Sequence, residues 1–488
     1  MRKRFEAQMT LGSTPIEKIE ITKKCRDEFP KFLLAMQYIY TEKELNEQIF
    51  SLLSDLICTK KPTGRHGMDL WTIFVLAGAR LCLNIDYDRL HYLAQNDNLL
   101  RQMLGIHDGI VRGREFKLQT IKDNVQLLDD NTLRKINQII VSAGHKLVQK
   151  KKMEALRIKV DSFVTEANVH FPTDYNLLWD SSRKCLDVLE KLMESDAGFC
   201  TGWRKIQNWR KRLKNLMLKL SRATADKSKN RAKRIKDCAI KYLTLARSLS
   251  SKIGTVKVLD PYDLVQEELI KQLKYYCQML DKHIDLVYRR LLKDEIIPHE
   301  EKIFSIFEPW VEWICKGKRH KQVELGKSTC IATDQWHFIV DWWVADHQTD
   351  SQILLPVIDR VKGNYDNLSQ CSTDKGFYSK MDVQILELND IKAIIPKKGK
   401  RSQSDIEKEN DPAFIKAKHA HSAIESNINE LEHRGLDRCP DRGIKGMHRY
   451  VGLGVIAYNL HRIGKILMEQ DNIIKNIAVK RKELKIAA

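Results

Sequence analysis

Three acidic residues that are distant in the sequence stand where carboxylates can perform chemistry. Asp161 closes the alternating run "LRIKVD", Asp374 closes the run "LSQCSTD", and Glu425 lies beside the apolar stripe of a later helical segment. We expect Glu425 to be half-buried, and a buried charge without a partner is costly. If the three carboxylates converge on one point, they repel one another unless a divalent cation lies between them. The pattern therefore predicts a site of oxygen ligands for Mg²⁺ or Mn²⁺.

The elements that would position these acids are strands with helices between them. Leu156, Ile158 and Val160 alternate with polar residues, a period of two that is typical of a half-buried strand with Asp161 on its polar face. Further strands are predicted in "CIATDQWHFIVDWWV", with a hairpin turn at residues 333–335, and in "LSQCSTD" and "IKAIIPKK". Apolar residues on both faces of the hairpin indicate central strands covered on two sides.

Helices and one loop are predicted around these strands. A helix begins near Asp350, and another begins at the capping pair Asp411 and Pro412 and ends at Gly435. The polar, lysine-rich run "KKGKRSQSDIEKEN", residues 397–410, is predicted to be a mobile loop. The expected fold class is therefore α/β, with helices packed around a sheet.

The remaining sequence is helical in pattern and suggests several domains. We predict an N-terminal helical, DNA-binding domain, in which "DYDRLHYLAQNDNLLRQMLG" has the pattern of a helix-turn-helix; packing alone also produces such hairpins. A long basic helical insertion is expected to interrupt the catalytic core after its first strand. The predicted bounds are 1–150 for the helical domain, 151–180 and 301–470 for the core, 181–300 for the insertion and 471–488 for a basic tail.

The charge of the chain is concentrated in one window. The net charge is +20, and residues 201–252 hold 17 Lys and Arg against only Asp226 and Asp237, a net of +15. A solvated helix face usually mixes signs, so this window favours binding to phosphates. The residues predicted to contact DNA are Arg204, Lys205, Arg210, Lys211, Arg212, Lys214, Lys397, Lys398, Arg434 and Arg438.

The cysteines and the apolar segments bear on the cellular compartment of the protein. Eleven cysteines are scattered without a Cys-x-x-Cys pair, which favours reduced thiols and argues against a zinc ribbon. The most apolar run, "LWTIFVLAGARLCLNI", is interrupted by Arg80 and is too short to span a bilayer. We therefore expect a cytoplasmic, nucleoid-associated protein without a membrane partner.

Four longer segments carry a family resemblance. They are "VDSFVTEANVHFPTDYNLLWDSSRK" (160–184), "EKIFSIFEPWVEWICKGK" (301–318), "TDKGFYS" (373–379) and "HSAIESNINELEHRGLDRCPDRG" (421–443). Because these segments are long and occur in this order, the chain resembles bacterial insertion-sequence transposases of the DDE type, most closely the ISNCY group. The resemblance covers roughly residue 60 to the end.

The resemblance implies both a fold and an activity. The fold would be an RNase H-like core, a mixed sheet flanked by helices. Asp161, Asp374 and Glu425 would be its catalytic residues and the ligands of two Mg²⁺ or Mn²⁺ ions. The activity would be cleavage at the ends of an insertion sequence followed by 3′-OH strand transfer into target DNA. The partners would be double-stranded DNA and, in the synaptic complex, at least a second copy of the chain.

Some details of the site differ from the family pattern or stay open. Some related families place Tyr and Arg one and two turns before the glutamate, where this chain has Lys418 and Ser422, so phosphate positioning falls to His421, Arg434 or Arg438. His421, Asp174 and Asp350 are expected to support the carboxylates. Asp346 and Asp350 are the rivals of Asp374 as the second acid. The rival functions are an inactive or domesticated DNA-binding protein, a nuclease that cuts without joining, and an RNA-binding or structural protein.

Overall fold

The chain forms two compact units in the computed structural model. The described residues are 13–22, 25–57, 67–107, 113–195, 203, 205–255, 263–315 and 322–487. The first unit comprises residues 1–168 and 314–488, and the second comprises residues 169–313. The helices predicted as a separate domain over 1–150 therefore belong to the same unit as the sheet. The helical insertion runs from 169 to 313, beyond the predicted bounds of 181 and 300 on both sides.

The first unit is built on a mixed sheet, which confirms the coarse expectation of an α/β fold with helices around a sheet. Its central strand β1 pairs antiparallel with β3 and parallel with β5, while β4 pairs antiparallel with β3 and β6 pairs parallel with β5. The order across the sheet is thus β4-β3-β1-β5-β6, and β7 adds a short parallel pair to β1. The strands are β1 (Leu156–Ala167), β3 (Glu324–Thr333), β4 (Ile339–Val344), β5 (Leu368–Thr373), β6 (Lys392–Ile394) and β7 (Arg438–Cys439); β2 (Glu312–Ile314) spans the boundary of the two units.

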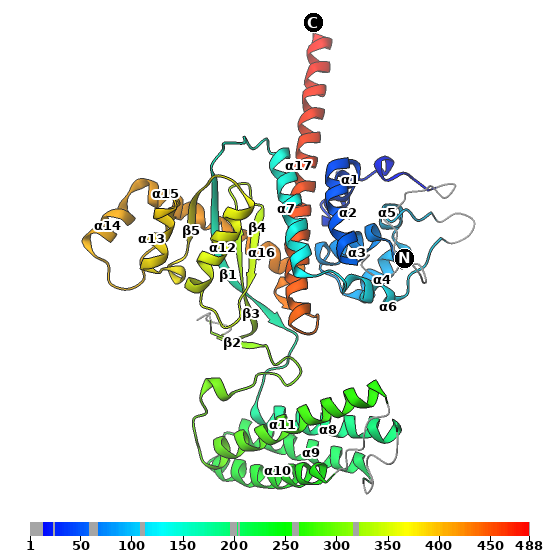
Figure 1. The fold of residues 1–488 in the computed structure, drawn as a ribbon, viewed down its shortest axis with the longest axis vertical. Helices are drawn as coiled ribbons and strands as arrows, with labels where there is room; N and C mark the ends of the chain where they lie inside the picture. Colours follow the sequence, from blue (N-terminus) through cyan, green and yellow to red (C-terminus); the bar gives the residue numbers. More distant parts are fainter. Residues whose placement is uncertain are drawn as a thin grey trace. The chain divides into compact units, whose positions relative to one another are not determined.

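The first unit contains helices from before and after the second unit in the sequence. They are α1 (Glu28–Thr41), α2 (Lys43–Ile57), α3 (Leu70–Cys82), α4 (Tyr87–Asn96), α5 (Asn98–Met103), α6 (Leu118–Val125), α7 (Asp130–Leu147), α12 (Asp350–Asn364), α13 (Lys380–Leu388), α14 (Gln403–Asn410), α15 (Pro412–His421), α16 (Ala423–Leu431) and α17 (Ile444–Ala487). Short segments η1 (Ile16–Lys18), η4 (Lys375–Phe377) and the π-helical η5 (Glu432–Leu436) connect them. Of these helices, α7 and α17 lie between the N-terminal helices and the sheet (Figure 1).

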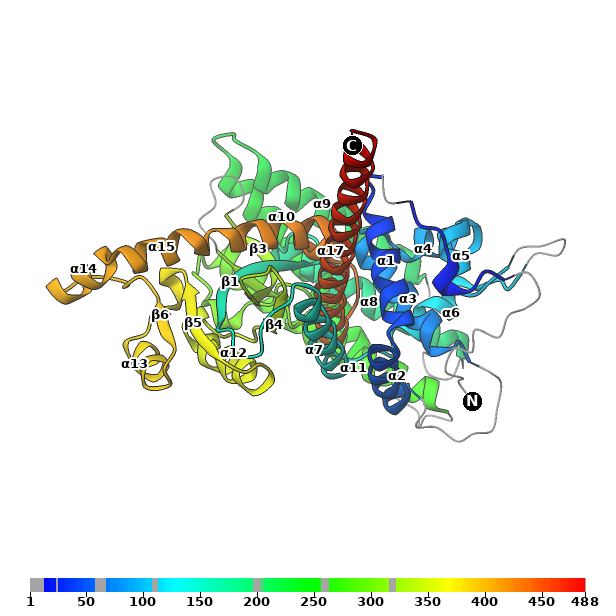
Figure 2. The same ribbon diagram turned by 90° about the horizontal axis from the view of Figure 1, so that it is seen from above.

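Helices α7 and α17 lie side by side and anchor the N-terminal helices to the sheet (Figure 1, Figure 2). Asn459 of α17 donates to Asn137 of α7 at 2.7 Å and to the carbonyl of Ile339 in β4 at 2.9 Å, and all three residues are buried. Gly144 of α7 packs on Phe338, because a Cβ at Gly144 would lie 2.3 Å from that ring. This contact is fixed by the hydrogen bonds between the buried amides and by the close packing of the Phe338 ring.

Several predicted local features are present. The β3–β4 hairpin turns at Asp334, whose Oδ1 accepts hydrogen bonds from the backbone N–H groups of Trp336 and Phe338 at 2.9 Å. Helix α12 begins at Asp350, and α15 begins at Pro412 with Asp411 as its N-cap. These starts are confirmed because each depends on a local capping or turn signal.

Two predictions about the C-terminal third were wrong. The run 397–410 is not wholly loop, because Ser402 and Asp405 form a capping box that starts helix α14. The helix expected between Pro412 and Gly435 is interrupted at Ser422, where i to i+3 backbone bonds make a tight turn between α15 and α16. Gly435 then ends the π-helical segment with a φ of +95°, a conformation that favours glycine.

The predicted helix-turn-helix corresponds to α4 and α5, which meet at Asp97. The Asp97 side chain accepts from the backbone N–H of Leu100 at 2.8 Å and caps α5. Trp71 of α3 donates to the carbonyl of Met103 at 2.8 Å, so α5 packs into the helical layer through buried residues. Reading of DNA by this pair stays a prediction.

The second unit is a set of four helices with a common apolar core. The helices are α8 (Asp174–Ser195), α9 (Ile206–Ala225), α10 (Arg231–Gly254) and α11 (Leu264–Leu292), followed by the turn η3 (His299–Glu301). Leu213, Leu220 and Leu243 are buried in this core, whereas Ile240 is exposed. The basic residues of the window 201–252 consequently lie mainly on the outer faces.

Candidate active site and nucleic-acid surface

Asp161 and Asp374 lie at neighbouring positions of two adjacent parallel strands. Val160 of β1 is paired with Thr373 of β5, so each aspartate is the next residue after a paired position. Asp374 follows the last residue of β5, caps η4, and exposes 71% of its side chain. Asp161 is half-buried within β1, where its Oδ1 accepts from the backbone N–H of Ser162 at 2.7 Å. The parallel register therefore sets Asp374, at the end of β5, level with Asp161, in the middle of β1.

His421 connects the end of α15 to this strand end. Its side chain is buried; Nε2 lies 3.6 Å from Asp374 Oδ1, and Nδ1 lies 3.3 Å from the hydroxyl of Ser372 on β5. The contact with His421 lowers the pKa of the Asp374 carboxyl below its ordinary value, and the charges of Lys375 and Lys418 act in the same direction. His421 thus occupies the supporting position that the sequence suggested, and it favours the ionised carboxylate.

Glu425 lies in the first turn of α16 and is exposed, which corrects the expectation that it is half-buried. The turn at Ser422 starts a new helix, and α16 directs Ile424, Asn427 and Leu431 into the protein instead. Among the residues that the structure describes, Asp161, Asp374 and Glu425 do not form a cluster in which all ligand atoms lie within 4.8 Å of one another. The predicted convergence on one point is therefore not complete in this structure.

The two rivals of Asp374 have different surroundings. Asp350 begins α12 and lies against the turn after β5, because a Cβ added at Gly376 would be 3.3 Å from Asp350 Oδ2. Asp346 is paired with the buried Lys327 of β3 at 2.6 Å, and that hydrogen bond lowers the pKa of Asp346. Asp350 is thus placed to support Asp374, whereas Asp346 is engaged by a lysine.

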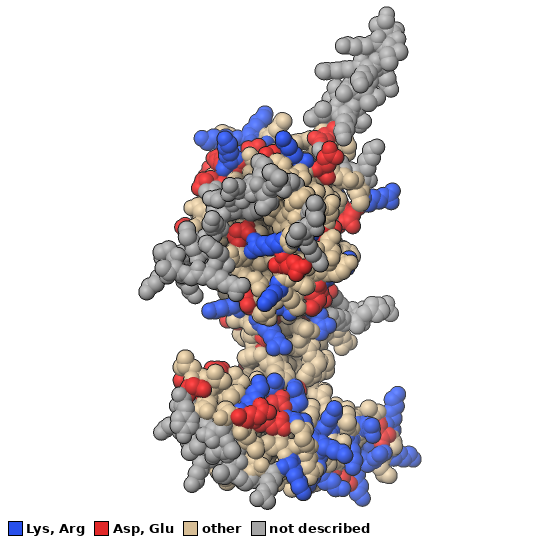
Figure 3. Space-filling view, turned by 90° about the vertical axis from the view of Figure 1, so that its right-hand side faces the viewer, with Lys and Arg blue, Asp and Glu red and all other residues tan. Residues whose placement is uncertain are grey.

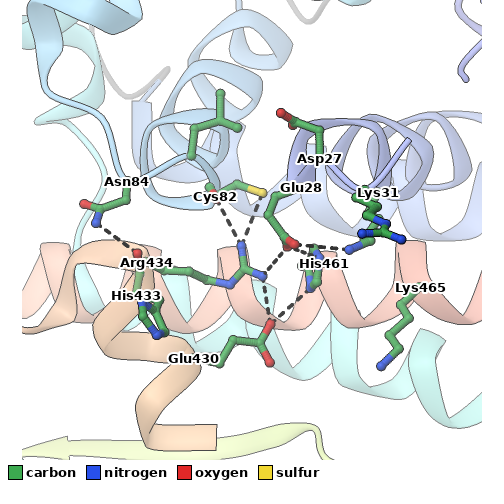
Figure 4. A pocket seen from close by; sticks show the side chains of 12 residues that line it. Asp27, Glu28, Lys31, Cys82, Asn84, Glu430, His433, Arg434, His461 and Lys465 are labelled. Atoms are coloured by element: carbon green, nitrogen blue, oxygen red, sulfur yellow. Dashed lines mark hydrogen bonds and ion pairs between the residues drawn. The ribbon is translucent and has the colours of Figure 1, made fainter. Parts of the chain in front are cut away.

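Arg434 is the clearest correction among the predicted DNA contacts. It is buried, and its guanidinium donates to Glu28 Oε2 at 2.9 Å, to Glu430 Oε1 at 2.8 Å and to the carbonyl of Cys82 at 3.0 Å (Figure 4). His461 of α17 pairs with the same two carboxylates. Arg434 thus joins α1, α3 and α16 through its two terminal nitrogens, and its charge is engaged inside the protein instead of being presented to a phosphate.

The network around Arg434 forms one wall of a pocket of about 660 Å³ (Figure 4). Burial alone would raise the pKa of Glu430, but hydrogen bonds from His461 and Arg434 outweigh it and lower that pKa to about 2. Burial lowers the pKa of His461, and its hydrogen bond to Glu430 opposes that change. The carboxylates are therefore kept ionised by their partners, as a structural ion-pair network requires.

The predicted phosphate contacts in the four-helix unit differ in their availability. Arg210 is not free, since it pairs with Asp187 and Glu190, each at 2.7 Å. Lys211, Arg212 and Lys214 are exposed, and in the described part of the chain no ion pair involves them. Lys205 precedes α9 with a φ of +60°, and Arg204 lies outside the described residues. Figure 3 shows Lys and Arg gathered over the helices of this unit.

A groove between α9 and α10 brings together three cations, one of which was a predicted phosphate contact. It has a volume of about 580 Å³ and is lined by Arg212, Lys219 and Lys241 together with the side chains of Asn215, Leu216, Ile240, Thr244, Leu245 and Ser248. Arg212 was predicted as a contact, whereas Lys219 and Lys241 were not singled out. Their spacing carried a signal, because residues seven apart, such as Arg212 and Lys219, lie on the same helix face.

The remaining predicted residues lie outside these clusters. Lys397 pairs with Asp405, so its charge is partly used, while Lys398 and Arg438 are exposed. Asp174 begins α8 in the second unit, where it pairs with Arg290 of α11 at 2.7 Å. The ion pair gives Asp174 a role in holding α8 to α11.

No family model, curated protein or solved structure matches the chain. None of the helices in the described ranges combines the length and the apolar character needed to cross a bilayer.

Proposed function

We propose that the protein is a DNA transposase of the DDE type, which cleaves DNA at the ends of an insertion sequence and transfers the 3′-OH ends to target DNA. The observation that supports the proposal is the parallel register of β1 and β5, in which Asp161 and Asp374 each directly follow the paired residues Val160 and Thr373. The strand order β4-β3-β1-β5-β6, antiparallel on one side of β1 and parallel on the other, supports the RNase H-like core that the resemblance implies.

The donor atoms near these strand ends fit a hard divalent cation. Asp161 and Asp374 offer carboxylate oxygens, the ligands that Mg²⁺ and Mn²⁺ prefer, and Glu425 lies one turn beyond the residue that contacts Asp374. When bound, two such ions activate the attacking oxygen and stabilise the leaving oxygen in phosphoryl transfer. We assign Asp161 and Asp374 as the principal ligands and Glu425 as the residue that completes the site.

The chain's own residues have separate tasks in this proposal. His421 contacts the Asp374 carboxylate and lowers its pKa, which favours the ionised form as a metal ligand. Asp350 supports the turn that follows β5. Arg212, Lys219 and Lys241 neutralise phosphates of the DNA, which releases counterions and supplies affinity without sequence preference. The partners are the two element ends, the target DNA and a second copy of the protein.

The products of the reaction test the proposal. The full-length protein would be incubated with Mg²⁺, with duplexes carrying the DNA that flanks its own gene, and with a plasmid target. We expect covalently joined 3′ ends in addition to nicks, both dependent on the divalent ion. Nicks without joined products would instead indicate a nuclease, and DNA binding without turnover would indicate a binding protein.

A further inference from the structure

A second pocket of the four-helix unit has a composition unlike that of the basic groove. It has a volume of about 580 Å³ and lies where the start of α8, the end of α9, the start of α10 and the end of α11 meet the segment 299–313. Its lining is rich in rings and in cations. These residues are Phe171, Phe304, Trp313 and His299, and Arg231, Arg290 and Lys302.

The rings form a connected group that remains accessible. Phe171 and Trp313 have centroids 5.4 Å apart at 61°, and Phe304 and Trp313 have centroids 5.5 Å apart at 37°. Phe171 is 59% exposed, an unusual state for a large apolar side chain that already has aromatic neighbours. An exposed ring beside a cavity offers a surface on which a flat ligand can stack.

The cations at this pocket are held in place by the fold. Arg290 pairs with Asp174 at 2.7 Å, and Arg231 donates to the carbonyl of Thr224 at 2.8 Å. Lys302 is exposed, and Asp174 is the single acid against three cations in the lining. The site therefore combines aromatic faces with an excess of positive charge, which suits a flat ligand that carries a negative charge.

We propose that this pocket binds an unpaired nucleotide of the DNA, with its base stacked on Phe171 and Trp313 and its phosphate beside Arg231 and Arg290. The volume lies in the range of pockets that enclose a ligand of this size. Aromatic stacking with a cationic surround is the usual way in which proteins hold unpaired bases. The inference rests on the proposed function, because it takes DNA as the ligand.

The basic groove supplies a route by which DNA reaches the pocket. Helices α9 and α10 line both sites. On α9, Lys219 lines the groove and Thr224 lines the pocket. On α10, Ile240 lines the groove and Ile235 lines the pocket. Five residues of helix span about 7.5 Å. A strand whose phosphates are bound by Arg212, Lys219 and Lys241 therefore passes close to the pocket.

The test compares duplexes that differ in one base. The full-length protein is titrated with a fully paired duplex, with the same duplex carrying a single unpaired 2-aminopurine, and with its abasic counterpart; anisotropy gives the affinity and 2-aminopurine fluorescence reports stacking. We expect the unpaired base to bind about 5- to 150-fold more tightly than the paired or abasic DNA, with quenched fluorescence.

Two variants assign the effect to the pocket. Phe171→Ala should remove the preference and the quenching while the affinity for paired DNA is retained, because Phe171 is exposed and its loss leaves the fold intact. Phe307→Ala is the matched control, since Phe307 is a partly exposed ring of the same unit that does not line the pocket. Equal binding of all three duplexes by the wild type, or a full preference in Phe171→Ala, would overturn the inference.

The same preparations separate this inference from the proposed function. Metal-dependent joining without any preference for the unpaired base rejects the pocket and leaves the transposase proposal standing. A clear preference without joining or cleavage supports the pocket and rejects the catalytic proposal. A protein that binds none of the DNAs contradicts both.

Discussion

Nε2 of His421 lies 3.6 Å from Oδ1 of Asp374, and this contact joins the end of α15 to the end of β5. Asp374 stands beside Asp161 through the parallel register of β5 and β1. The helix junction that carries His421 also begins α16, which bears Glu425. A buried imidazole thus links the two neighbouring aspartates to the helix that holds the third acid.

The titration of Asp374 should depend on His421. In the native protein the contact with His421 depresses the pKa of Asp374 below its unfolded value. The interaction therefore contributes stability above that unfolded pKa, and the contribution is lost as the pH falls through the folded pKa. We expect His421→Gln to raise the pKa of Asp374, measured by carboxyl NMR. His419→Gln, an exposed neighbour on the same helix, is the control. An unchanged Asp374 titration in His421→Gln would contradict the assignment.

Arg434 and Arg438 should respond differently to the same substitution. Arg434→Gln leaves Glu28 and Glu430 without their buried guanidinium partner. We expect the free energy of unfolding to fall by about 3 kcal/mol. This value is at the low end of the range for a broken buried ion pair, because both carboxylates are partly exposed to solvent. Arg438→Gln changes an exposed side chain and should stay within about 0.5 kcal/mol. Urea unfolding of both variants measures the difference. Equal free energies of unfolding for the Arg434→Gln and Arg438→Gln variants would show that the ion pairs of Arg434 do not stabilise the fold.

Glu430 gives a separate prediction about acid stability. Its pKa is lowered to about 2 from 4.5, so its ion pairs stabilise the fold fully above pH 4.5 and are lost as the pH falls toward 2. The difference in free energy of unfolding between wild type and Glu430→Gln should therefore shrink across that interval. Denaturant curves at several pH values measure it, and a difference that is constant with pH would argue against the ion pairs.

The α9–α10 groove should control the salt dependence of DNA binding. Replacing Arg212, Lys219 and Lys241 by Gln removes up to three phosphate contacts, and each contact accounts for about 0.9 in the slope of log affinity against log salt. We therefore expect the slope to decrease by about 2.7, with the fold unchanged. Arg210→Gln is the contrasting variant, since it should lower the stability of the bundle through Asp187 and Glu190 while it leaves the slope nearly unaltered. An unaltered slope in the triple variant would place the DNA elsewhere.

The features that the sequence predicted correctly depend on local physics. The alternation from Leu156 to Val160 gave the central strand, and caps or turn residues gave the hairpin at Asp334 and the helix starts at Asp350 and Pro412. Each signal is contained in a few neighbouring residues. The placing of Asp374 at a strand end followed from those signals, whereas the mixed sheet was implied by the family resemblance.

The features that the sequence did not predict depend on residues brought together by folding. Arg434 resembles any basic residue in a polar helix, and its partner Glu28 is 406 positions away. The interruption at Ser422 has no Gly or Pro to mark it, so an uninterrupted helix was expected and the exposure of Glu425 was misjudged. The N-terminal helices join the sheet through contacts between α7 and α17. These contacts link residues that are distant in the sequence, such as Asn137 and Asn459, which are 322 positions apart, so no local pattern indicates them.

The most direct test of the account is strand transfer by carboxylate variants in the presence of Mg²⁺. Asp161→Asn and Asp374→Asn should each reduce the amount of joined product by more than about 100-fold, while the affinity for DNA is retained. The reason is that losing a metal ligand should cost more activity than the roughly 10- to 100-fold lost when a residue that only supports a ligand is replaced. Asp366→Asn, an exposed acid just before the opposite end of β5, should join normally. Joining by Asp161→Asn or Asp374→Asn at the wild-type rate would contradict the proposed active site, and joining by Glu425→Gln would remove Glu425 from it.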